Sequence, residues 1–253
     1  MLALFCLRLA TGLCAALLIL SPKQINPRFY RTHFLAILGL ASAAGILLFG
    51  TGSLLLAVCL AMGLTSAFVG SIVWSLQGAP GGRLAIGTTI TCLVAAFVVW
   101  DLGTAHEAIA VQSSGWHLAN NLASAWLLGT ATTAMLMGHS YLIAPAMSLT
   151  PLLRLLVALA SAVFFQAILA GLSLWSWTHE QPSANLTSVA VYWLPLRWAM
   201  SFVGPLVLGW MAWQSARIRS TQSATGILYV VVVFCFLGEL TGQLLLSETG
   251  FCL

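Results

Sequence analysis

A carboxylate inside an apolar stretch is the first sign of chemistry in this sequence. Glu239 lies well within residues 222–247, which are apolar enough to span a lipid bilayer. An ionised side chain at the centre of a membrane helix costs about 2.5–3.5 kcal/mol, so it is rarely kept without a partner or a function. Gln243 follows four residues later, on the same face of a helix. We therefore expect a polar site on this helix.

Two arginines are buried in other apolar stretches. Arg8 falls within residues 2–20, and Arg197 falls within residues 188–214. At the helical rise per residue, Arg8 lies about 9 Å, Glu239 about 12 Å and Arg197 about 14 Å from helix ends that share one side of the membrane. We therefore expect the three side chains at similar depth, in one pocket with two cations and one anion.

Such a pocket suits a quinone headgroup, a small anion or a proton path. For a quinone, Glu239 is the candidate catalytic group, because a carboxylate can accept the proton that a quinol releases. Arg8, Arg197 and Gln243 are then the candidate ligands of the quinone oxygens. The simpler alternative is an Arg–Glu pair that fixes helix packing, with Arg8 reaching outward to the membrane surface.

Two histidines offer a weaker possibility, one haem b. His139 lies about 10 Å from the opposite end of the helix expected over residues 117–146. His33 begins the range 33–51 on that same side of the membrane. Two histidines at similar depth on different helices can be the axial ligands of one haem. The alternative is a packing histidine beside one at the membrane surface. No Cys/His spacing is typical of a metal site, so we expect none.

Prolines flank one of the buried arginines. Pro195 and Pro205 stand on either side of Arg197, with Gly204 and Gly209 nearby. Each proline removes a helical hydrogen bond and frees a carbonyl one turn earlier. The helix is therefore expected either to kink for packing or to line a cavity.

The composition indicates where these residues must sit. Of 253 residues, 60% are hydrophobic and only 6% are charged, whereas about 25% is usual for a soluble domain. This excludes a soluble enzyme and a nucleic-acid-binding protein. We predict an all-α polytopic membrane protein, one domain over residues 1–253, with a bundle of eight transmembrane helices. The expected ranges are 2–20, 33–51, 53–76, 84–104, 117–146, 150–176, 188–214 and 222–247.

The charged residues predict the orientation of these helices. Apart from Arg8 and Arg197, the basic residues lie in or beside alternate connections of the expected helices, namely Lys23, Arg28, Arg31, Arg83, Arg154, Arg217 and Arg219. The acids on the other side are Asp101, Glu107, Glu180 and Glu248. Basic loops stay in the cytoplasm, so both termini are predicted on the non-cytoplasmic side of the inner (plasma) membrane.

Three functions fit this pattern. The first is a membrane subunit of an electron-transfer complex with a quinol site, which would need membrane or peripheral partners on the non-cytoplasmic side. In architecture, though through no particular motif, this is similar to the eight-helix quinol-oxidising anchors of the polysulfide-reductase type. The second is a small anion or proton-coupled transporter. The third is a structural or assembly subunit.

Overall fold

Helices form the secondary structure of the computed structural model, which describes residues 1–49, 54–76, 81–104, 114–144, 147–180 and 188–252. They are α1 (Leu2–Leu17), α2 (Pro27–Leu47), α3 (Leu54–Val73), α4 (Gly82–Thr104), α5 (Ser114–Ile143), α6 (Thr150–Glu180), α7 (Ser188–Trp198), the π-helical turn η1 (Ala199–Val203), α8 (Gly204–Arg217) and α9 (Thr221–Thr249). No strand occurs among these residues, so the expected all-α class is confirmed. Glu107 lies outside the described residues.

Each expected apolar range contains a helical run, but some ends differ. α2 begins at Pro27 rather than at residue 33. The Asn26 side chain caps this helix by accepting a hydrogen bond from the Arg28 backbone N–H at 3.0 Å. Proline suits the first helical position because the N–H that it lacks would have no partner there. Hydropathy misses this first turn because Arg28 and Arg31 interrupt the apolar run.

Several helices are suited to a lipid environment. Five of those described are long and apolar enough to cross a membrane, and they lie within α2, α3, α4, α6 and α9. α1 is a shorter apolar helix of 16 residues. Large apolar side chains, including Ile46, Leu54 and Trp210, are exposed on the outside of the bundle. An exposed apolar surface of this kind is stable in lipid, so the chain belongs in a membrane.

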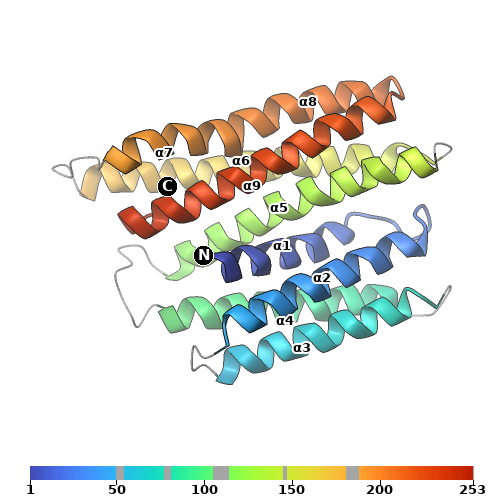
Figure 1. Ribbon diagram of the computed structural model, residues 1–253, viewed down its shortest axis with the longest axis horizontal. Coiled ribbons are helices and arrows are strands. Elements are labelled where there is room, and N and C mark those ends of the chain that lie inside the picture. Colours follow the sequence, from blue (N-terminus) through green and yellow to red (C-terminus); the bar gives the residue numbers. More distant parts are fainter. Residues whose placement is uncertain (50–53, 77–80, 105–113, 145–146, 181–187, 253) are drawn as a thin grey trace.

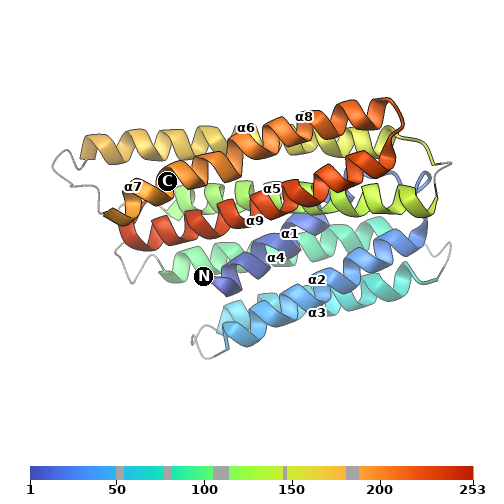
Figure 2. The same ribbon diagram turned by 45° about the horizontal axis from the view of Figure 1, so that its top comes forward.

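When α7, η1 and α8 are counted as one continuous run, the described helices pack into two rings of four (Figures 1 and 2). In the first ring α1 contacts α2 and α4, and α3 also contacts both of them. In the second ring α5 contacts α6 and α9, while α8 contacts the same two helices. The rings meet mainly along α1 and α5, with a smaller contact between α4 and α5. In both rings the helices thus follow one another in chain order around the ring. The two halves of the sequence show no repeat that would predict this shared neighbour order.

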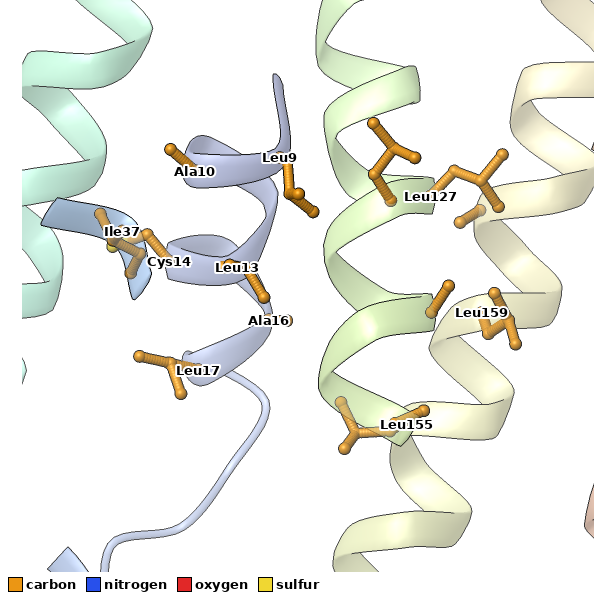
Figure 3. Close-up of a cluster of buried hydrophobic side chains, with 14 of the residues drawn as sticks. Leu9, Ala10, Leu13, Cys14, Ala16, Leu17, Ile37, Leu127, Leu155 and Leu159 are labelled. Atoms are coloured by element: carbon orange, nitrogen blue, oxygen red, sulfur yellow. The ribbon is translucent and has the colours of Figure 1, made fainter. Parts of the chain in front are cut away.

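Glycines allow the two rings to approach closely. A Cβ atom at Gly12 of α1 would overlap the carbonyl of Ala125 on α5, and one at Gly129 would overlap the backbone of Gly12. Small residues permit this backbone contact between membrane helices. Figure 3 shows α1 with apolar side chains on both sides, where Cys14 lies beside Ile37 of α2 and Leu9 points toward α5. α1 and α5 therefore form the contact between the two rings.

The connections between helices collect basic residues at one end of the bundle. α1, α3, α5 and α8 end, and α2, α4, α6 and α9 begin, at the same end of the bundle in Figure 1, and both termini lie toward the other end. Lys23 belongs to the first of these links, and Arg219 belongs to the last. Arg83, Arg154 and Arg217 lie within the first or last five residues of the helices that these links join.

Candidate functional site

Arg8 and Glu239 form a salt bridge in the bundle interior. The Arg8 Nη1 atom contacts Oε1 of Glu239, and the two side chains are 2% and 3% exposed. Arg8 comes from α1 and Glu239 from α9, so the pair joins the two rings. On α9 the residues at helical spacing before Glu239 are buried as well, namely Thr225, Leu228, Val232 and Cys235. This stripe faces the interior as its spacing predicts.

Asn121 and Asp101 extend the pair. Arg8 donates from Nε to Oδ1 of Asn121 at 3.0 Å and also from Nη2 to the same oxygen. Asn121 in turn donates from Nδ2 to the Asp101 carboxylate, at 3.0 Å to Oδ1 and 3.2 Å to Oδ2. Asp101 is buried near the end of α4. The chain of contacts Glu239–Arg8–Asn121–Asp101 thus spans α9, α1, α5 and α4.

Asp101 changes the charge of the site. The expected pocket held two cations and one anion, because Asp101 was placed on the outer surface of the membrane. In the structure its carboxylate joins the network through Asn121, so Arg8 and Arg197 are matched by Glu239 and Asp101. A formally neutral set of ionised groups is cheaper to bury than a net positive one.

Arg197 packs against α9 beside this network. Its Nη1 atom donates to the carbonyl of Gly238 at 3.3 Å, and a Cβ atom at Gly242 would overlap the same nitrogen. The guanidinium carbon lies 5.9 Å from the centroid of the Phe202 ring. Among the described residues the buried Nε atom has no hydrogen-bond partner. Glycines on α9 therefore make room for the Arg197 side chain, and its Nε donor has no acceptor among the described residues.

A π-helical turn follows Arg197 directly. Residues Ala199–Val203 form η1, and the Gly204 N–H bonds to the carbonyl of Ala199, five residues earlier. Pro205 follows and has no N–H to donate. The expected disruption therefore takes the form of a wider turn within a continuous helical run. π-turns of this kind are frequent at functional sites. The buried Ser201 of this turn packs against Gly238, where a Cβ atom would overlap its hydroxyl.

A small cavity lies where these side chains meet. Its lining residues are Arg8, Asn120, Arg197, Glu239, Gly242, Gln243, Leu246 and Cys252. The volume open to the centre of a water molecule is ≈ 10 Å³, which is about the space that one water needs. Gln243 donates from Nε2 to Oε1 of Glu239 at 3.5 Å. Its own Oε1 is buried and has no hydrogen-bond partner among the described residues.

The residues after α9 fold back onto the site. Gly250 adopts a left-handed conformation (φ 74°), which ends the helix and reverses the chain. Phe251 and Cys252 are buried as a result. The Cys252 Sγ atom lies 3.4 Å from Nδ1 of His117, and burial raises the pKa of this thiol to about 11. Gly250 could have signalled the helix end, but no sequence pattern indicated that Cys252 lines the cavity.

A second polar cluster supports the cavity wall. Gln166 of α6 donates from Nε2 to Oδ1 of Asn120 and to Oγ of Ser124, both at 3.1 Å. All three residues are buried. Two consecutive asparagines, Asn120 and Asn121, thus serve different partners from one turn of α5. Their position inside an apolar helix was the signal that could have marked them as site residues.

The structure does not bring the two candidate haem ligands together. His33 is buried, and its Nδ1 atom lies 2.9 Å from the carbonyl of Phe29 on its own helix. His139 is exposed on α5. α1 lies between α2 and α5 in both views of the bundle. The geometry therefore gives no support to one haem shared by these histidines. The described residues also contain no group of three or more His, Cys, Asp or Glu side chains that could hold a metal.

Of the candidate residues, four therefore gather in one place. Arg8, Arg197, Glu239 and Gln243 line the same cavity, and Asn121 with Asp101 completes the network behind it. Comparison of this chain with protein-family models, with curated proteins and with solved structures found no match.

Proposed function

We propose that this chain is an integral-membrane subunit of an electron-transfer complex in the inner (plasma) membrane. In this proposal all eight helical runs cross the bilayer, and both termini face the non-cytoplasmic side. The positive-inside rule supports that orientation, because the basic connections share one end of the bundle. Membrane or peripheral subunits on the non-cytoplasmic side would receive the electrons.

The site proposed for the quinol is the cavity beside Arg8 and Glu239. One observation carries this assignment: a buried donor, Nε of Arg197, and a buried acceptor, Oε1 of Gln243, are unpaired on two residues that line one cavity. Unpaired buried polar atoms are costly unless a ligand or water uses them. A quinone headgroup has carbonyl oxygens that accept from an arginine, and a quinol has hydroxyl groups that donate to an acceptor.

The proton chemistry follows from the same residues. Oxidation of a quinol to a quinone releases two electrons and two protons. Glu239 would accept a proton when its bond to Arg8 loosens, and Asp101 is the next carboxylate along the network. The electrons would leave to a redox group of a partner subunit. Because the cavity has room for about one water, the ring would enter by displacing the tail at Cys252.

Quinone extraction and binding test this function. We expect the purified chain to retain quinone and to bind a short-chain quinone analogue in a calorimetric titration. Arg197→Gln and Glu239→Gln should each weaken binding of the analogue at least tenfold, since a hydrogen bond to a charged group contributes about 1.5–3 kcal/mol. The exposed Arg83→Gln is the matched control. A wild-type chain that neither retains quinone nor binds the analogue would exclude the quinol site.

A transporter for a small anion or a proton-coupled solute is the second candidate. The observation that favours it is the position of the site between two four-helix rings with the same neighbour order. Transporters commonly bind their substrates at such an interface between repeats. Anion uptake into proteoliposomes that collapses in Arg197→Ala, from a chain that binds no quinone, would replace the first proposal with this one.

A further inference from the structure

An apolar groove runs between α6 and α8, away from the buried charges. Its volume is ≈ 400 Å³, and aliphatic and aromatic side chains line it. On α6 the lining includes Val157, Ala160 and Phe164, which share one helix face by their spacing. Val157 and Phe164 are both exposed on the bundle surface. The groove is therefore open to the surrounding lipid.

The α8 side of the groove is formed largely by two tryptophans. Trp210 and Trp213 line it together with Gly209, and Trp210 is 63% exposed. A Cβ atom at Gly209 would meet only Leu159, at 3.8 Å. No clash therefore requires glycine at this position, but the missing side chain leaves more room in the groove. Tryptophan is enriched where membrane helices meet the headgroup layer.

Both walls of the groove lead to an arginine at the same end of the bundle. Arg154 stands three residues before Val157 on α6, and Arg217 stands four residues after Trp213 on α8. These spacings keep each arginine next to the groove face of its helix. α6 begins and α8 ends at the end of the bundle that holds the basic connections (Figure 1).

The two arginines are exposed, and no described carboxylate pairs with them. Both are exposed side chains, and the described part of the chain contains one salt bridge, between Arg8 and Glu239. The sequence from 140 to 160 and from 205 to 225 contains no Asp or Glu. A positive charge at the mouth of an apolar groove complements an amphiphile that carries an anionic head.

We propose that this groove binds an anionic phospholipid. One acyl chain lies along Ala160 and Gly209, and the phosphate group meets Arg154 and Arg217. A neutral apolar groove alone would not distinguish one lipid from another, because every lipid has the same kind of tail. The pair of arginines supplies the selectivity, since guanidinium groups bind phosphate through charge-assisted hydrogen bonds.

Native mass spectrometry of the full chain in mild detergent tests this site. The protein is incubated with equal amounts of phosphatidylglycerol and phosphatidylcholine, and the retained lipids are counted. We expect one phosphatidylglycerol to be retained with at least tenfold preference. Arg154→Gln with Arg217→Gln should reduce that preference below twofold. Ala160→Trp should remove the retained lipid because the indole fills the groove.

The exposed Arg31→Gln, on the first ring, is the matched control, and unchanged melting temperatures verify that each variant is folded. Equal retention of both lipids by the wild-type chain would overturn the proposal. So would a loss of preference in Arg31→Gln as large as in the double variant, which would indicate attraction to the whole basic end. A partner protein released by Ala160→Trp, with the lipid count unchanged, would show that a helix occupies the groove instead.

Discussion

At the residue scale, the Arg8–Glu239 pair has two interpretations, a structural link between helices and a part of the quinol site. As a structural link it would need only opposite charges in contact. As part of a quinol site it would need a carboxylate that can take a proton. Removing one partner of a buried pair costs about 3–5 kcal/mol because the other charge is left uncompensated, whereas replacing both with apolar residues is often neutral.

A double-mutant cycle separates these interpretations. We expect Arg8→Leu and Glu239→Leu each to lower the free energy of unfolding by about 3–5 kcal/mol, and the double variant to recover most of that loss. Thermal or denaturant unfolding in detergent measures it. A double variant that regains stability but does not bind the quinone analogue supports the functional role. One that regains both shows that the pair only holds the helices together.

The depth of the charged residues could be predicted from the sequence, but their neighbours could not. Counting helical rise placed Arg8, Arg197 and Glu239 at one level, and the structure gathers them around one cavity. Asp101 also lay near the end of an expected helix, and it was assigned to the membrane surface. Hydropathy does not indicate that a polar side chain of another helix can bond to a carboxylate at that position. Asn121 of α5 makes this hydrogen bond to Asp101.

At the scale of elements, the crossing of α1 and α5 sets the geometry of the site. Gly12 follows Arg8 by one turn, and Ala125 follows Asn121 by one turn. The close approach of Gly12 to Ala125 and Gly129 therefore brings Arg8 within hydrogen-bonding distance of Asn121. Small residues in the sequence showed that close packing was possible, but not which helix would be the partner.

Alanine at Gly12 should therefore disturb both packing and the polar network. We expect Gly12→Ala to lower the free energy of unfolding by about 1–3 kcal/mol, the usual cost of overpacking, because its methyl group would overlap α5. Gly39→Ala is the control, since a Cβ atom there meets nothing within 4 Å. Unfolding in detergent gives the comparison, and equal effects of both substitutions would contradict the role of this crossing.

At the scale of the whole molecule, the alternating basic connections predict its orientation. A cysteine introduced at Ser247, near the end of α9, should react with a membrane-impermeant maleimide on intact cells. One at Ser220, in the link between α8 and α9, should react only after the membrane is permeabilised. Labelling is read above the wild-type background. The reverse pattern would invert the orientation and place the buried charges in the cytoplasmic half.

The fold class and the helix ranges followed from composition and hydropathy because a lipid-facing chain has few alternatives to helices. The pairing of two four-helix rings did not follow, because their sequences share no pattern and the similarity lies in neighbour order alone. Tail residues such as Cys252 were also unpredictable, since one left-handed glycine decides where the chain goes after α9.

The salt bridge between α1 and α9 has a consequence for how the chain is made. α1 is made early in synthesis, and Glu239 is added only after the intervening helices. Until then Arg8 lacks this carboxylate partner in a lipid environment, where an isolated charge is unstable. The pairing is thus a late step of assembly. A chain stalled before α9 would keep Arg8 bonded to Asn121 but without a carboxylate in direct contact with it, a feature by which cellular quality control could distinguish unfinished molecules from finished ones.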